Sequence, residues 1–184
     1  MGEKMNAGDH IVRNLIANGI ETVFGLPGVQ TYPLFDALAR NADKIRTVSA
    51  RHEQATAYMA LGYAKSTGRP SVYSVVPGPG VLNTGAALCT AYGVNAPIMC
   101  LTGQVPSEFL GRERGHLHEL ADQQATLSTF IKAAHRIEHP QDANRTFAEA
   151  WRTMISGRQG PVSLETCWDT MTMAADLPAP AKVT

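Results

Sequence analysis

Short β-branched segments alternate with longer helical segments along almost the whole chain. Strand-like segments lie near residues 22–26, 45–49, 72–76, 98–102, 131–137 and 162–166. They are apolar without strict polar alternation, as in sheets that are covered on both faces. The alternation predicts an α/β fold with a three-layer, doubly wound sheet, mainly parallel, of about six strands with helices on both faces.

Ligands of doubly wound sheets bind beyond the carboxyl ends of the strands. The candidate loops are therefore those that follow strands, and they begin at Pro27, Ala50, Pro77 and Gly103. The fourth loop, from Gly103 to Ala121, lacks a clear period, and a long loop in a compact domain is more often functional than incidental.

Charge and hydropathy exclude several classes of protein. The chain has 16 Lys and Arg against 16 Asp and Glu, so it carries no electrostatic footprint for nucleic acid or an anionic membrane. Asp9, Arg13 and Asn14 interrupt any signal-peptide core, and no apolar run reaches membrane-spanning length. We expect a cytoplasmic chain without nucleic-acid or membrane partners.

The three cysteines are odd in number and far apart in the sequence. Cys89, Cys100 and Cys167 each lie in an apolar stretch, and none belongs to a C-x-x-C pair. This pattern predicts buried, reduced thiols.

The second loop carries Arg51-His52-Glu53 at the start of a long alanine-rich helix. An acid in the first helical turn is favoured by the helix dipole, so Glu53 alone is ordinary. A capping box from Ser49 would need a glutamate at position 52, where His52 stands. A structural and a functional role for Glu53 therefore both remain open.

The third loop, Pro77-Gly-Pro-Gly-Val-Leu-Asn83, superficially resembles a dinucleotide-binding loop. Asn83 stands where the third glycine should be, and Pro79 removes an amide donor from the phosphate cradle. The strand that ends near Thr102 also carries no acid for a ribose. These departures argue against NAD binding.

The fourth loop contains His116, His118 and Glu119. Two histidines two residues apart could ligate a metal, but no third ligand follows at zinc-like spacing. We expect no metal site here. A solvated polar loop and a substrate-facing loop both remain open.

Four motifs in order nevertheless resemble one family. They are F-G-x-P-G at residues 24–28, R-H-E-x-x-A-x-x-M-A-x-G-Y-A at 51–64, G-P-G-x-x-N at 78–83, and an apolar strand ending at Gly103. Over residues 9–169 the chain resembles the N-terminal pyrimidine-binding domain of thiamine-diphosphate-dependent enzymes. This group of enzymes includes acetolactate synthase, benzaldehyde lyase, benzoylformate decarboxylase, oxalyl-CoA decarboxylase and glyoxylate carboligase.

The resemblance implies roles for individual residues. Glu53 matches the family's glutamate, which hydrogen-bonds N1′ of the aminopyrimidine ring and favours the tautomer that removes the C2 proton of the cofactor. It also implies cofactor contacts from Pro27, Gly28, Val29, Val76, Pro77 and Asn83. On the substrate side it suggests Gln30, His116, His118, Glu119 and Gln123. Where acetolactate synthases commonly show Phe-Gln-Glu, this chain has Leu117-His118-Glu119, so the substrate stays open.

The family's diphosphate signature, G-D-G with a later asparagine, is absent from the sequence. By the resemblance, thiamine diphosphate would be held here through its pyrimidine half, and Mg²⁺ only by a missing domain or partner. We expect a pyrimidine-binding domain over residues 1–170 and the start of an interdomain linker over 171–184, with the central and diphosphate-binding domains absent.

Three hypotheses follow for the chain as a whole. It is part of a homodimeric or tetrameric enzyme that decarboxylates or ligates a small 2-oxo acid or aldehyde, and is inactive alone. Alternatively, it is the alpha-type subunit of a two-chain 2-oxo acid decarboxylase, or a non-catalytic interaction module of the same fold. We also expect exposed apolar surface around Ala57, Leu61, Leu88 and Tyr92 to drive self-association.

Overall fold

A computed structural model describes residues 3–184. Over these residues a six-stranded sheet has the order β3-β2-β4-β5-β7-β6, and every neighbouring pair is parallel. Its strands are β2 (Thr22–Gly25), β3 (Arg46–Ser49), β4 (Ser71–Val75), β5 (Ile98–Gln104), β6 (Ala133–Ile137) and β7 (Val162–Cys167). The predicted α/β class and parallel sheet are confirmed.

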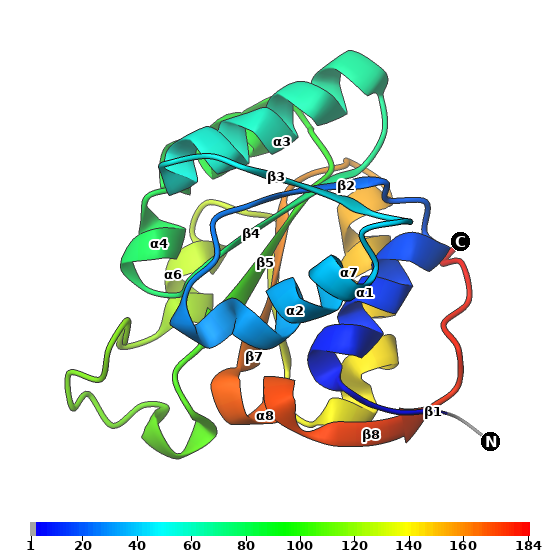
Figure 1. The fold of residues 1–184 in the computed structure, drawn as a ribbon. Helices are drawn as coiled ribbons and strands as arrows, with labels where there is room; N and C mark the ends of the chain where they lie inside the picture. Colours follow the sequence, from blue (N-terminus) through cyan, green and yellow to red (C-terminus); the bar gives the residue numbers. More distant parts are fainter. Residues whose placement is uncertain (1–2) are drawn as a thin grey trace.

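Helices cover both faces of this sheet (Figure 1). One face carries α1 (Ala7–Ala17), α2 (Tyr32–Arg40), α7 (Ala143–Ile155) and α8 (Trp168–Thr172), whose buried side chains share one apolar core. The other face carries α3 (Glu53–Thr67), α4 (Pro79–Leu82), α5 (Gly85–Gly93) and α6 (Gln123–Ser128), with a second core. The sheet is therefore the middle of three layers.

Helix α3 begins and ends at recognisable caps. The His52 ring accepts a hydrogen bond from the Gln54 amide at 3.1 Å, which satisfies one free donor of the first turn. Gly68 ends the helix in the left-handed conformation at φ +68°. The caps place Glu53 at the first helical position, and this end of α3 lies at the carboxyl edge of the sheet.

The prediction of an exposed apolar surface for self-association is wrong for three of its four residues, because they are buried. Ala57 and Leu88 are fully buried, and Leu61 is only 7 % exposed, because α3 and α5 turn these side chains toward the sheet and each other. Tyr92, at 42 % exposure, is the one that reaches the surface.

The segment after Gly78 forms two short helices instead of one continuous helix. α4 ends at Leu82, and α5 begins at Gly85. Between them, the Thr84 hydroxyl donates to the Val81 carbonyl at 2.7 Å and accepts from the buried Tyr73 hydroxyl at 2.9 Å. Local hydrogen bonding by the threonine competes with a continuous helix. The break leaves Asn83 at the edge of the sheet.

The two ends of the chain meet beside α1. Strand β1 (Glu3–Asn6) pairs antiparallel with β8 (Ala174–Leu177). The buried His10 ring lies 3.2 Å from the Ala175 carbonyl, and Val183 donates its amide to Asn18 at 2.8 Å. Part of the segment 171–184 thus packs on the domain, while its role as a linker stays a prediction.

Two of the three predicted buried thiols are confirmed. Cys100 and Cys167 are buried, and burial raises the pKa of each to about 12, so both thiols stay protonated. Cys89 is exposed on α5, and its predicted burial is wrong because it faces away from the sheet. Within residues 3–184 no helix is long and apolar enough to cross a membrane.

Replacing Phe147 with alanine tests the larger core. Its side chain is fully buried and stacks on Trp151 with ring centroids 5.6 Å apart. We expect Phe147→Ala to lower the free energy of unfolding by about 3–5 kcal/mol, measured by urea denaturation. Met173→Ala, at a side chain 45 % exposed, is the control and should stay within about 0.5 kcal/mol of wild type. Equal losses in both variants would contradict this account of the core.

Candidate functional site

The loops named from the sequence meet at one edge of the sheet. Pro27 and Gly28 follow β2, Val76 to Gly78 follow β4, and the fourth loop follows β5. Because β2, β4 and β5 are parallel neighbours, their carboxyl ends lie side by side. Helix α3 starts at the same edge (Figure 1).

The Val76 side chain lies between two glycines from different loops. A Cβ atom on Gly28 would stand 2.2 Å from Val76 Cγ1, and one on Gly80 would stand 2.5 Å from Cγ2. Real carbon atoms never approach so closely, so both positions require glycine as the chain is folded. The first and third loops therefore share a small apolar surface formed by Val76.

Glu53 lies against this surface with its carboxylate held by Asn83. Asn83 Nδ2 donates to Glu53 Oε2 at 2.9 Å. The other oxygen, Oε1, lies 3.8 Å from where a Cβ on Gly80 would stand. Oε1 accepts no hydrogen bond from any residue that the structure describes. One oxygen is thus fixed by the protein while the other faces the turn that carries Gly80.

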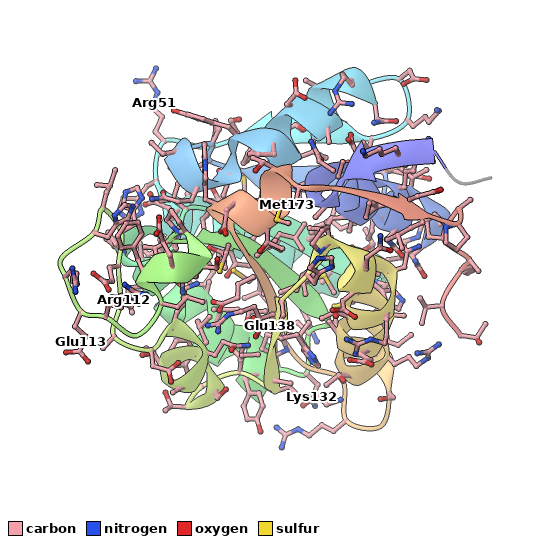
Figure 2. The ribbon with its side chains drawn as sticks, turned by 90° about the horizontal axis from the view of Figure 1, so that it is seen from below. Arg51, Arg112, Glu113, Lys132, Glu138 and Met173 are labelled. Atoms are coloured by element: carbon pink, nitrogen blue, oxygen red, sulfur yellow. The ribbon has the colours of Figure 1, made fainter. Side chains whose placement is uncertain are left out.

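Arg51 and His52 do not share this arrangement. Arg51 extends away from the body of the domain (Figure 2). His52 uses its ring to cap α3. Of the Arg-His-Glu motif, only the Glu53 side chain is directed to the third loop.

The fourth loop packs tightly on the third. Gly78 has φ +60° and ψ −119°, a conformation that favours glycine, and a Cβ there would stand 2.3 Å from the His118 carbonyl oxygen. The Gly78 amide donates to Gln123 Oε1 at 2.8 Å. Both contacts hold the turn before α4 against the segment that contains His118.

Gln30 joins the first loop to the fourth. Its side chain is only 2 % exposed, and its Nε2 donates to the Leu117 carbonyl at 3.0 Å. Its Oε1 lies 2.6 Å from His118 Nδ1. His118 is one of the few non-glycine residues with positive φ, at +67°. Such strained positions cluster at functional sites, although the strain alone assigns no role.

The two histidines of the fourth loop differ in their surroundings. Burial lowers the pKa of His118, while the Glu53 charge raises it in part, so the imidazole is mostly uncharged near pH 7. His116 stacks on Phe109 with ring centroids 4.6 Å apart, and its amide donates to Glu119 at 2.8 Å. Across residues 3–184, no cluster of three or more His, Cys, Asp or Glu side chains could hold a metal.

Beneath the loops lies a buried ion pair that the sequence analysis missed. Glu165 in β7 is fully buried, and its Oε1 accepts from Arg136 in β6 at 2.5 Å. Gln123 Nε2 donates to the other oxygen at 2.6 Å. Burial raises the pKa of Glu165, and the Arg136 charge and the Gln123 bond oppose that shift. A lone glutamate inside the apolar strand at 162–167 was the available signal.

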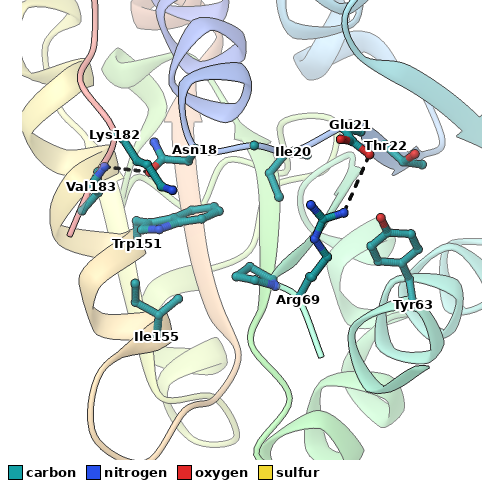
Figure 3. Close-up of a pocket in the computed structure, with 12 residues that line it drawn as sticks. Asn18, Ile20, Glu21, Thr22, Tyr63, Arg69, Trp151, Ile155, Lys182 and Val183 are labelled. Carbon is teal, nitrogen blue, oxygen red and sulfur yellow. Dashed lines mark hydrogen bonds and ion pairs between the residues drawn. The ribbon is translucent and has the colours of Figure 1, made fainter. Parts of the chain in front are cut away.

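A separate cavity lies at the opposite edge of the sheet. This cavity of about 320 Å³ is lined by Ile20, Tyr63, Trp151 and Val183 among others (Figure 3). Glu21 and Arg69 pair across it at 3.8 Å. It sits at the amino ends of the strands, away from Glu53, so it takes no part in the candidate site.

Comparison with known proteins gives a consistent answer. Residues 5–126 match the family model described as "Thiamine pyrophosphate enzyme, N-terminal TPP binding domain". The chain is 35 % identical over 91 % of its length to a probable 2-ketoarginine decarboxylase of Pseudomonas aeruginosa. It is 32 % identical over 97 % of its length to a probable acetolactate synthase large subunit of Methanocaldococcus jannaschii, and 30 % identical over 95 % to acetolactate synthase isozyme 1 large subunit of Escherichia coli.

In each of these three relatives the matched region is 30 % of the relative's length. The resemblance seen in the sequence motifs is thus confirmed over the N-terminal part of such proteins. The chain belongs to the thiamine pyrophosphate enzymes, of which it represents the N-terminal TPP-binding domain.

Proposed function

We propose that this domain binds the aminopyrimidine half of thiamine diphosphate for an enzyme that makes or breaks a C–C bond next to a carbonyl. The substrate class is a small 2-oxo acid or aldehyde. The observation that carries the proposal is the Glu53 carboxylate, held by Asn83 beside Gly80 and the Val76 side chain, which packs against both Gly28 and Gly80.

The residues present fit an aminopyrimidine ring. A flat heteroaromatic ring needs an apolar surface for its face and polar groups for its edge. Val76 supplies the first, and the Glu53 carboxylate supplies the second. The proposed cofactor contacts are Pro27, Gly28, Val29, Glu53, Val76, Pro77 and Asn83. When bound, the cofactor supplies the reactive carbon that adds to a substrate carbonyl.

Glu53 is the proposed catalytic residue because one carboxylate oxygen is still available. The Asn83 amide satisfies Oε2 and fixes the plane of the carboxylate. Oε1 is left to share a proton with a ring nitrogen, and hydrogen bonds to a carboxylate are stronger than those between neutral groups. The role of Glu53 is thus to hold a proton at Oε1 against the ring.

His118 is the best supported of the substrate-side residues. Gln30 donates its Nε2 protons to the Leu117 carbonyl, so its oxygen accepts from His118 Nδ1. This assigns the neutral tautomer with the proton on Nδ1 and a lone pair on Nε2. His118 would therefore accept a hydrogen bond or a proton at Nε2. His116 and Glu119 would lie on the same substrate side, and Gln30 and Gln123, which are buried, would support it from beneath.

The diphosphate and its Mg²⁺ call for a second surface. The G-D-G signature is absent from the sequence, and the relatives are more than three times as long as their matched part. We propose that a diphosphate-binding domain of the same or a partner chain completes the site in a homodimer or tetramer. The alternatives are a two-chain decarboxylase and a non-catalytic module of this fold. Exchange of the C2 hydrogen of bound cofactor distinguishes them from the proposed enzyme.

The first test replaces Glu53 with glutamine in the protein assembled with its diphosphate-binding domain. We expect Glu53→Gln to slow exchange of the C2 hydrogen of bound cofactor by about 10²-fold or more, because the amide cannot share the carboxyl proton. Stability should stay within about 0.5 kcal/mol of wild type, since Glu53 is half-buried and carries no packing role.

Glu21→Gln, at the opposite edge of the sheet, is the control and should leave exchange unchanged. Equal exchange rates in the Glu53→Gln variant and wild type would overturn the assignment. A wild-type assembly that fails to promote exchange would favour the non-catalytic module. Exchange only after a separate diphosphate-binding chain is added would favour the two-chain enzyme.

The second test follows the His118 imidazole by NMR titration. Because burial lowers its pKa, the midpoint should lie below the reference of about 6.5. Between the two values the unfolded state binds more protons, so this group makes the free energy of unfolding rise with pH and fall as the pH drops. Glu53→Gln should lower the midpoint further, because it removes the carboxylate charge that raises the pKa.

Glu21→Gln again serves as the control and should leave the His118 midpoint in place. A midpoint at or above the reference would contradict the burial that lowers the pKa of His118. A midpoint that does not respond to Glu53→Gln would contradict the close placement of the two side chains.

A further inference from the structure

We infer that Gln123 is a positioning residue. Together with the buried Arg136–Glu165 pair it fixes the position of the Gly78 amide. Through α4, it thereby also fixes the position of the Glu53–Asn83 pair. The inference rests on the proposed function in one respect, namely that Glu53 and Asn83 bind the cofactor. The contacts themselves do not depend on it.

A continuous series of hydrogen bonds links the far strands to the third loop. Arg136 in β6 donates to Glu165 Oε1 in β7 at 2.5 Å. Gln123 Nε2 donates to Glu165 Oε2 at 2.6 Å, and Gln123 Oε1 accepts from the Gly78 amide at 2.8 Å. Each amide atom of Gln123 thus has a defined partner.

The ion pair fixes which way the Gln123 amide points. A carboxylate kept ionised by a guanidinium only accepts hydrogen bonds, so it must receive the Nε2 end of Gln123. The Oε1 end is then forced toward Gly78. With 1 % exposure, Gln123 has no solvent to offer an alternative partner. Orientation, more than stability, is what a buried ion pair of this kind can provide.

The position of Gly78 is passed on to Asn83 through a short helix. The Leu82 amide donates to the Gly78 carbonyl at 2.9 Å, and the Asn83 amide donates to the Pro79 carbonyl at 3.0 Å. The six residues from Gly78 to Asn83, joined in this way, would move together. Asn83 then holds Glu53 Oε2 at 2.9 Å. A displaced Gly78 would therefore displace the donor that orients the carboxylate.

Several charged or titratable groups surround Glu165. Arg136 attracts it, and Glu138 contacts Arg136 from the exposed side at 3.7 Å. Asp122 repels it and raises its pKa. Cys100 and Cys167 lie close enough to interact but stay protonated, with pKa values of about 12. Arg136 is thus the group that favours the ionised form of Glu165 most strongly.

The experiment compares Gln123→Met with Gln124→Met in isotope-labelled protein. Gln124 is the next residue of α6, is only partly exposed, and its side chain makes no hydrogen bond to another residue within 3–184. The readouts are hydrogen exchange of the Gly78 amide and the NMR signal of the Asn83 side-chain amide. A third readout is binding of the free pyrimidine half, 4-amino-5-hydroxymethyl-2-methylpyrimidine.

We expect Gln123→Met to reduce protection of the Gly78 amide by about ten-fold, since one buried hydrogen bond is lost. The Asn83 signal should shift, and binding of the pyrimidine should weaken by a similar factor. Gln124→Met should leave all three unchanged. Unchanged Gly78 protection and an unchanged Asn83 signal in Gln123→Met would overturn the inference.

Gln123→Glu keeps the test decisive if Gln123→Met does not fold. It places a second carboxylate beside Glu165, and such pairs share one proton once the pH falls. We expect Gly78 protection, relative to an unstructured amide, to be low at about pH 8 and to recover at about pH 5.5 as the shared proton restores the bond. A pure packing role would give the same loss at both pH values and would reject the inference.

The proposed function can fail separately. If wild-type protein does not bind the pyrimidine but Gly78 and Asn83 respond as described, the positioning series stands and the cofactor assignment falls. If the pyrimidine binds equally to wild type and Gln123→Met, and Gly78 is unaffected, the cofactor assignment stands and the positioning role falls.

Discussion

The candidate site depends on positions where another residue approaches the backbone so closely that only glycine fits. A Cβ at Gly28 would meet Val76, one at Gly78 would meet the His118 carbonyl, and one at Gly103 would meet the Gln30 carbonyl, all within 2.3 Å. The first two contacts each join loops that follow different strands, and the third joins the end of β5 to the first loop. A side chain at any of these positions would push two loops apart and separate the groups that the site must bring together.

Once the loops touch, two buried glutamines connect them. Gln30 links the first loop to the fourth, and Gln123 links the fourth to the third. A primary amide suits this position because it carries a donor and an acceptor on one short group, so it can join a backbone group to a side chain of the opposite kind. Both side chains are at most 2 % exposed, which makes an unsatisfied amide costly and the observed orientation strongly preferred.

Local patterns in the sequence predicted the sheet and the meeting of its loops, because strand–helix alternation and parallel pairing leave little choice of topology. They could not predict which face of α3 is buried, since its alanines give almost no periodicity, and so Ala57 and Leu61 were placed wrongly. The register between strands distant in the sequence could not be predicted either. No residue near Glu165 in the sequence indicates that it lies opposite Arg136 in the neighbouring strand.

The Glu53–Asn83 bond is the least protected of these contacts. It lies toward solvent, where a hydrogen bond between side chains contributes about 0.5–1.5 kcal/mol at most. Leu82 and Leu117, at 45 % and 58 % exposure, are large apolar side chains that follow β4 and β5 at the same edge of the sheet. A second protein surface laid over them would remove water from the carboxylate and strengthen its bonds, since electrostatic attraction grows as the local dielectric falls. In the proposed enzyme, therefore, the covering domain would contribute to catalysis by excluding solvent from Glu53 as well as by binding the diphosphate.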